Sequence, residues 1–354
     1  MTNTQLNQYQ DVKPIKPWTL TFKDVLADIV TIIIITLATL VTLAATPMRG
    51  KLGFLGALFF YAIVGTVIRG FISKRPKAIG NSLSSLFIYI AAGTVVAPVM
   101  SILYTIVSRG ITGLSLGIFK HDMGVAVPDS PLNEGGLLHA LIGTVEIVSF
   151  STILCVPIAV LTALYLTEIR GRFSGLVRFL VQAMSGVPSI IAGLFIYAVY
   201  LISFHGRYSG IAGAMALSIL MLPTVARVAE EVLKLIPDDL REAGLALGAT
   251  QWRTVSRIVI PTARSGLITA VILGVARIAG ETAPIILTIG GNDRVNWNLF
   301  SGQMSALPFY VWRQYLYGGE LPIARAWTGI LVLMLIVMFF FTLTRLLSRR
   351  GNKV

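Results

Sequence analysis

The chain has 354 residues, of which 55% are hydrophobic and 13% are charged. This balance excludes an ordinary soluble domain of the same length and indicates a protein that crosses a membrane several times. The formal net charge of +13 would suggest nucleic acid in a soluble protein. In a membrane protein, lysines and arginines collect on the cytoplasmic side, so we expect a lipid bilayer and no nucleic acid as partner.

Eight segments have the length of about 20 apolar residues that crosses a bilayer. They are 25–46, 52–72, 82–107, 138–166, 179–202, 210–233, 265–290 and 324–347. We therefore predict an all-α polytopic membrane protein. An even number of spans places both termini on one side, and the loops of that side hold 20 basic residues against 8 on the other. By the positive-inside rule, both termini are expected in the cytoplasm.

The segments outside the spans are informative in a few places. The first two dozen residues are polar and lack a small-residue cleavage site, so no cleaved signal peptide is expected. Residues 108–137 are predicted to form a polar surface loop. In 291–322, aromatic residues mix with Arg313 and Gln314, which predicts a short amphipathic helix at the outer membrane interface. The three histidines show no metal-ligand spacing, so no metal or cofactor is expected.

The long cytoplasmic loop 236–261 reads IPDDLREAGLALGATQWRTVSRIVIP. Pro237 and the two aspartates after it favour a helix start, and Gly248 fits a left-handed cap at its end. Thr250 can cap a second helix, which Pro261 is expected to end before the next span. The loop is therefore predicted to be a helix–turn–helix. An ordinary amphipathic loop resting on lipid is the alternative that composition alone would favour.

The spacing in this loop resembles the EAA loop of ATP-binding-cassette (ABC) importer permeases. That pattern is EAA, three residues, G, nine residues, I, one residue and LP; here glycine replaces the second alanine and isoleucine the leucine. In that family the loop docks in a groove of a cytoplasmic ATPase. The resemblance implies a type I ABC importer permease core and a coupling function for seven residues: Arg241, Glu242, Ala243, Gly244, Gly248, Ile258 and Pro261.

A nucleotide site of the chain's own is not expected. The sequence contains no GxxxxGK[ST] phosphate-binding loop. It also has no soluble domain large enough for a nucleotide. We therefore expect a transport subunit that is not an enzyme, with ATP hydrolysed by a separate partner.

Two charged residues, Arg277 and Glu281, lie inside the span 265–290. An arginine near the centre of a membrane helix costs roughly 2.5–3.5 kcal/mol on an insertion scale. A spacing of four residues sets both on one helix face, and Gly280 and Pro284 would loosen the helix there. One explanation is a structural ion pair between spans. We favour the other, a translocation path in which the arginine holds an oxyanion through its forked donors.

Two segments narrow the expected identity of the substrate. RIAGETAPIILT (277–288) and GVPSIIAGLF (186–195) resemble segments of the PstA-type phosphate permeases, and the resemblance extends over roughly 138–347. It implies that phosphate is the substrate, with molybdate or sulfate as alternatives. A secondary transporter would not need the EAA loop, and a membrane enzyme would need a nucleophile–base pair that we do not find. The residues expected along the path are Arg277, Glu281, Thr282, Gly186, Pro188 and Ser189.

The resemblance also implies an assembly in the bacterial cytoplasmic (inner) membrane. Its expected partners are a second homologous permease (PstC-like), two copies of an ATPase (PstB-like) and an extracytoplasmic phosphate-binding protein (PstS-like).

Relatives of this type begin near the third span, which predicts three regions. Residues 1–80 form a two-helix N-terminal extension that packs beside the core or binds a partner. Residues 81–137 hold the third span and an extracytoplasmic loop, and 138–347 form the permease core. Glu146 is not expected from the family; it either lies near the outer interface or pairs with Arg277.

Overall fold

The computed structural model describes residues 22–45, 51–72 and 76–350. Within these ranges the regular elements are helices, with one isolated bridge between Gly290 and Met304. The first 21 residues, on which the expectation about a signal peptide mainly rests, lie outside the described ranges. Contacts divide the chain into two compact units, Met1–Ser101 and Ile102–Val354. The prediction of an all-α membrane protein is confirmed.

Each predicted span falls on an apolar helix or helix pair. Among the described residues, five helices are long and apolar enough to cross a membrane, and one bent pair makes a sixth candidate. Two shorter apolar helices lie in the first two predicted spans. The five are Phe87–Gly113, Leu138–Ile169, Gly210–Lys234, Gln251–Ala279 and Glu320–Thr342; the pair is Ser174–Ser185 with Ser189–Ser203; the shorter two are Ile29–Ala44 and Gly56–Ile68.

The first unit is built on a helical hairpin of α1 (Phe22–Ala45) and α2 (Lys51–Ile72). The hydroxyl groups of Thr42 and Tyr61 are 2.7 Å apart across the pair. A Cβ on Gly65 would lie 3.0 Å from Cδ1 of Ile35, so the glycine lets the two backbones approach closely. A third helix, α3 (Pro76–Gly110), begins in this unit.

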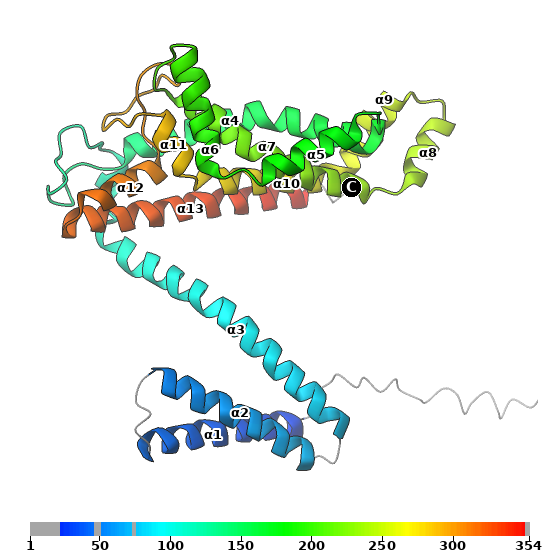
Figure 1. Cartoon of the computed structure of the whole chain (residues 1–354), viewed down its shortest axis with the longest axis vertical. Helices are drawn as coiled ribbons and strands as arrows, with labels where there is room; N and C mark the ends of the chain where they lie inside the picture. Colours follow the sequence, from blue (N-terminus) through cyan, green and yellow to red (C-terminus); the bar gives the residue numbers. More distant parts are fainter. Residues whose placement is uncertain (1–21, 46–50, 73–75, 351–354) are drawn as a thin grey trace, which may run out of the picture. The chain divides into compact units, whose positions relative to one another are not determined.

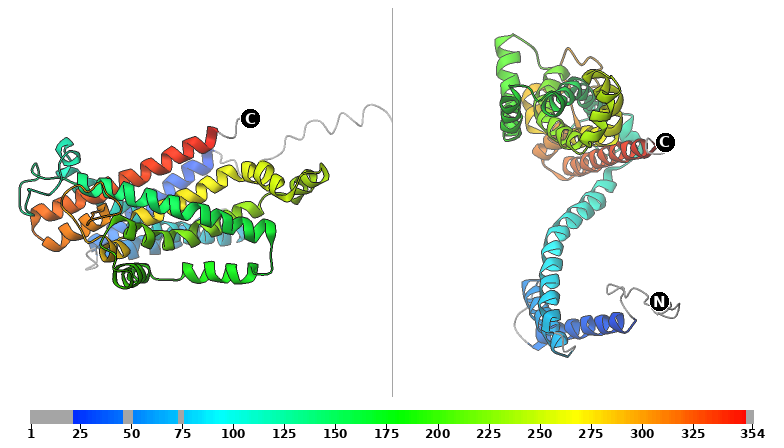
Figure 2. Two further views of the ribbon diagram at one scale, coloured as in Figure 1. Left: turned by 90° about the horizontal axis from the view of Figure 1, so that it is seen from above. Right: turned by 90° about the vertical axis from the view of Figure 1, so that its right-hand side faces the viewer.

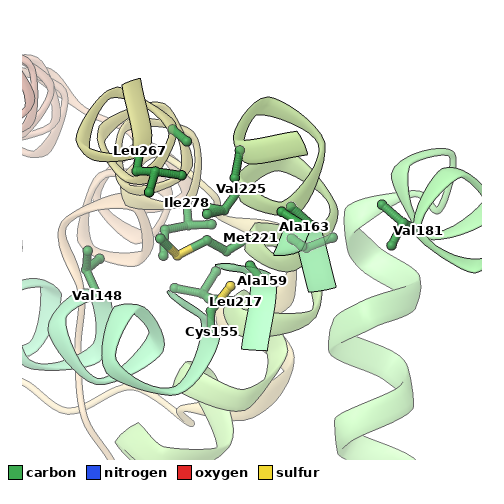
Figure 3. Packing of buried hydrophobic residues seen from close by; sticks show 14 of the residues in the cluster. Val148, Cys155, Ala159, Ala163, Val181, Leu217, Met221, Val225, Leu267 and Ile278 are labelled. Atoms are coloured by element: carbon green, nitrogen blue, oxygen red, sulfur yellow. The ribbon is translucent and has the colours of Figure 1, made fainter. Parts of the chain in front are cut away.

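The second unit is a bundle of long helices (Figures 1 and 2). Its main members are α4 (Leu138–Leu164), α7 (Gly210–Lys234), α10 (Ile260–Ala279) and α13 (Glu320–Arg350). Small residues such as Ala159 and Ala214 are fully buried and allow α4 and α7 to pack closely. Figure 3 shows Cys155, Ala159 and Met221 inside this core.

The fifth predicted span is not one straight helix. α5 (Ser174–Ser185) and α6 (Ser189–Ile196) meet at a bend of 102°, and α6 continues as the wide turn η5 (Tyr197–Ser203). Pro188 explains the break, because it lacks an N–H and disfavours a helical conformation for the residue before it.

The seventh predicted span is also interrupted. α10 ends at Ala279, and a separate short helix, α11 (Ala283–Thr288), follows Gly280, Glu281 and Thr282. The expected loosening around Gly280 is therefore confirmed.

Residues 108–137 differ from the predicted polar surface loop. They contain the short turns η2 (Ile111–Gly113) and η3 (Leu116–Phe119). Ile118, Met123 and Leu137 are buried in a cluster with residues of α12 (Leu307–Tyr317) and α13. The apolar residues of this loop follow no helical or strand period, so the pattern did not reveal their burial.

Arg325 of α13 fixes one stretch of this loop. Arg325 is 3% exposed, and its guanidinium donates hydrogen bonds of 2.5–3.5 Å to five backbone carbonyl oxygens. These belong to Val127, Pro128, Ser130, Pro131 and Glu134. The short helix predicted within 291–322 is present as α12, but it is not simply an interfacial helix, because Leu307, Tyr310 and Gln314 are buried against the bundle.

Candidate functional site

The helix–turn–helix predicted in 236–261 is present. α8 (Asp238–Ala246) begins directly after Pro237, as expected. The chain then turns through Gly248, whose φ is +79°. Thr250 caps α9 (Gln251–Thr254), its hydroxyl oxygen accepting a hydrogen bond of 3.3 Å from the Arg253 N–H.

The end predicted for the second helix was wrong. Pro261 does not terminate it; the chain passes through the wide π turn η6 (Val255–Val259) directly into α10, with Pro261 in the first turn of α10. Proline has no N–H to donate to a helical hydrogen bond. It is tolerated there because the π turn before it already interrupts the regular pattern of helical hydrogen bonds.

Two of the predicted coupling residues, Gly244 and Ile258, are separated in the sequence but pack against each other. Gly244 is buried, and a Cβ added to it would lie 2.8 Å from Cδ1 of Ile258 and 3.0 Å from Oγ1 of Thr254. The two arms of the loop therefore meet at these positions. Glu242, Ala243 and Gly248 are exposed.

The sequence analysis missed an apolar surface at the tip of this loop. Leu245, Leu247 and Trp252, which we call the apolar corner, are 50%, 90% and 69% exposed. The leucines within and directly after the short charged helix α8 are visible in the sequence, but periodicity alone did not show which of them would be exposed. Three large exposed apolar side chains in one short loop are typical of a protein–protein contact.

Arg241, also predicted to couple, points inward. Its side chain is 15% exposed and forms an ion pair with Glu168, whose side chain is 6% exposed. Hydrogen bonding to Glu168 raises the pKa of the Arg241 guanidinium above its usual value. A second buried carboxylate, Glu230 of α7, binds Arg178 and Lys234, both at under 3 Å.

Arg277 lies near the end of α10, and its side chain is exposed. It shares a face of the helix with Leu273, which is 43% exposed. Glu281 is half-buried in the break after α10, so the two charges are not one turn apart on a continuous helix. Across the described residues, no ion pair forms between Arg277 and Glu281, nor between Arg277 and Glu146. One carboxylate oxygen of Glu146 is buried without a hydrogen-bond partner among those same residues.

The two interrupted helices pack against each other. α6 follows the bend at Gly186, Pro188 and Ser189, and α11 follows the break that contains Glu281 and Thr282. Both helices are in the second unit, and Figure 1 shows them together. At their contact, a Cβ on Gly193 would lie only 2.5 Å from Cα of Pro284. The structure thus brings together the two segments that sequence analysis assigned to the path, although they are about ninety residues apart.

Comparison with known proteins identifies the family. The family model described as "Binding-protein-dependent transport system inner membrane component" matches residues 155–353, more than half of the chain. The chain belongs to this family. It is therefore a membrane-embedded permease subunit of a transport system, as the sequence predicted.

Relatives narrow the group within the family. The permease is 35% identical over 263 residues to "Phosphate transport system permease protein PstA 1" of Mycobacterium tuberculosis (strain CDC 1551 / Oshkosh), covering 74% of this chain and 86% of that protein. It is 38% identical over 256 residues to PstA of Haemophilus influenzae (strain ATCC 51907 / DSM 11121 / KW20 / Rd), covering 69% and 85%. The predicted resemblance to PstA-type permeases is confirmed.

A solved structure supports the fold. The inward-facing MetNI methionine ABC transporter, in its CY5 native crystal form, aligns with a TM-score of 0.50 and 19% identity over 62% of this chain and 95% of that one. The permease thus shares the helical fold of that transporter chain.

Proposed function

We propose that this permease is one of two membrane subunits of an ATP-driven phosphate importer. The observation that carries the proposal is the exposed Arg277 in the last turn of α10, just before the break that leads to α11, which itself packs against α6. A cation at a break within a membrane span is functional by default, and a guanidinium suits a phosphate-like oxyanion. The names of the PstA relatives favour phosphate over molybdate or sulfate.

The site residues then have two functions. Arg277, Glu281 and Thr282 border the path together with the bend at Gly186, Pro188 and Ser189. Ile258, Gly244 and Gly248 shape the coupling loop, whose apolar corner docks on a separate cytoplasmic ATPase. Glu242 and Ala243 are exposed in the same loop. Arg241 fixes its geometry from within, and Pro261 lies in the first turn of the helix that follows it.

The complete importer contains four kinds of protein. This permease pairs with a second, homologous PstC-like permease, two copies of a PstB-like ATPase and a PstS-like phosphate-binding protein. Residues 1–80 are an N-terminal addition to the core 138–347, and residues 81–137 connect the two.

Reconstitution tests the substrate. Proteoliposomes that contain the permease and these partners should take up labelled phosphate only when ATP and the loaded binding protein are both supplied. Unlabelled phosphate should compete, whereas equal sulfate or molybdate should not. Competition by molybdate or sulfate alone would contradict phosphate as the substrate.

The coupling loop is tested at Gly248. Its φ is +79°, and nothing lies within 4 Å of an added Cβ, so a side chain there costs backbone strain only, about 1–2 kcal/mol. Gly248→Val should insert normally but lower ATP-driven uptake several-fold, because the two arms would meet at another angle. Gly248→Asn is the matched control, since asparagine tolerates positive φ, and it should transport nearly normally. Equal uptake by both variants would refute the geometry of this turn.

The proposed orientation places the coupling loop in the cytoplasm and residues 108–137 outside. Val125 is 93% exposed and Leu247 is 90% exposed, while the native Cys155 is 1% exposed and should give no background. In intact cells, an impermeant thiol reagent should label Val125→Cys and leave Leu247→Cys unlabelled until the membrane is opened. The reverse labelling pattern would overturn the orientation.

A further inference from the structure

One residue, Glu168, holds both arms of the coupling loop. It lies in η4 (Tyr165–Ile169), the wide turn at the end of α4. Arg241 of α8 donates to the two carboxylate oxygens of Glu168, from Nε at 3.0 Å and from Nη2 at 2.9 Å. Gln251 of α9 donates from Nε2 to the carbonyl oxygen of Glu168 at 2.9 Å. α8 and α9 are therefore attached to the same point of the bundle.

Arg241 also reaches the end of α7. It donates to the carbonyl oxygens of Leu233 at 3.0 Å and Ile236 at 2.7 Å, and to the carboxylate of Asp238 at 2.9 Å. With the bonds to Glu168, these contacts use all five N–H donors of the guanidinium. Arg241 thus has no donor to spare for another protein, and its contacts join α8 to both α4 and α7.

We propose that the Glu168–Arg241 pair is the stiff link through which the coupling loop moves α4 and α7. Both are positioning residues for transport, and neither touches the ATPase. The inference rests on the proposed function, because it requires an ATPase that acts on the loop. Burial makes the link stiff: a forked, desolvated ion pair has one favourable geometry, and losing either partner leaves the other charge buried and unpaired.

The link is tested in the complete reconstituted importer by the number of phosphates taken up per ATP hydrolysed. Glu168→Gln and Arg241→Gln should each lower this ratio about tenfold, the factor equivalent to ~1.4 kcal/mol, while the ATPase stays bound. The double variant should be no worse than either single variant, because both changes remove the same interaction. Arg241→Lys, which keeps the charge without the fork, should fall between them and the wild type.

The matched control is the ion pair between Arg227 and Glu231 on α7. Its atoms are 3.7 Å apart and its side chains are 61% and 66% exposed, so it is screened by water. Arg227→Gln should leave the ratio unchanged. If Glu168→Gln keeps the wild-type ratio while Arg241→Gln lowers it, Arg241 acts by direct docking and the proposal is wrong. Lower amounts of protein with an unchanged ratio in both would equally overturn it.

A second measurement is independent of the substrate. A spin label on Leu247→Cys reports the motion of the loop in the purified full-length permease, since Cys155 is buried. The label should become more mobile with Glu168→Gln or Arg241→Gln and not with Arg227→Gln. Unchanged mobility in the first two would refute the link. Failure of the wild-type importer to move phosphate, with these label results intact, would instead refute the proposed function.

Discussion

Replacing Arg277 with glutamine is expected to abolish ATP-driven phosphate uptake while the amount of permease in the membrane stays normal. The exposed guanidinium has no ion-pair partner among the residues that the structure describes, so its removal strands no carboxylate there. Losing two charge-assisted hydrogen bonds to phosphate, each worth about 1.5 kcal/mol or more, should lower uptake roughly 100-fold. Uptake of labelled phosphate into proteoliposomes, divided by the permease recovered, measures the effect.

Three comparisons make this result specific. Arg277→Lys keeps the charge but not the fork and should retain some of the uptake. Arg227→Gln removes an exposed arginine elsewhere and should transport normally. The double variant Arg277→Gln/Glu281→Gln should be as inactive as Arg277→Gln. A structural ion pair predicts otherwise: each single change would cost about 3–5 kcal/mol and lower the folded amount, and the double change would restore both amount and uptake.

The coupling loop was predictable because its determinants are local. Pro237, Gly248 and Thr250 act on the backbone within a few residues, through a fixed φ, a left-handed turn and a side-chain cap. These effects need no knowledge of the remaining bundle. The prediction for Pro261 was wrong because its effect depends on the turn before it, and a π turn lets the helix continue.

The positioning contacts were not predictable in the same way. Glu168 and Arg241 are separated by 73 residues, and Arg325 binds carbonyl oxygens nearly 200 residues before it. Local propensity says nothing about which charges meet across a bundle. The resemblance to the EAA loop predicted that Arg241 takes part in coupling to an ATPase. In the structure, its five N–H donors all bind groups of its own chain.

The interrupted helices were predictable only in part. Gly280 and Pro284 predicted the interruption between α10 and α11, which is present, whereas the bend between α5 and α6 lies in a segment that was predicted as one span. Their mutual packing was not foreseen, because it depends on the absence of a side chain at Gly193. Gly193 lies within the segment GVPSIIAGLF (186–195), but the sequence alone does not show that it faces Pro284.

The contact between α6 and α11 therefore gives a second large expected effect. Gly193→Leu should abolish uptake and lower the amount of folded permease. Even the Cβ of alanine would lie 2.5 Å from Cα and 3.1 Å from the carbonyl oxygen of Pro284. These are backbone atoms that cannot rotate away, so the helices must separate. Overpacking of this kind costs about 1–3 kcal/mol or more, and the displaced α11 would carry the break after Arg277 with it.

Glycine substitutions of graded size separate the contact from a general effect of losing a glycine. Gly193→Ala should already impair uptake, and Gly193→Leu should be worse in both uptake and thermal stability of the purified permease. Gly175 in α5 has nothing within 4 Å of an added Cβ, so Gly175→Ala should leave both unchanged. Normal uptake by Gly193→Ala would mean that α6 and α11 need not touch during transport. The two interrupted helices would then not border the translocation path together. The assignment of Gly186, Pro188 and Ser189 to that path would lose its structural basis.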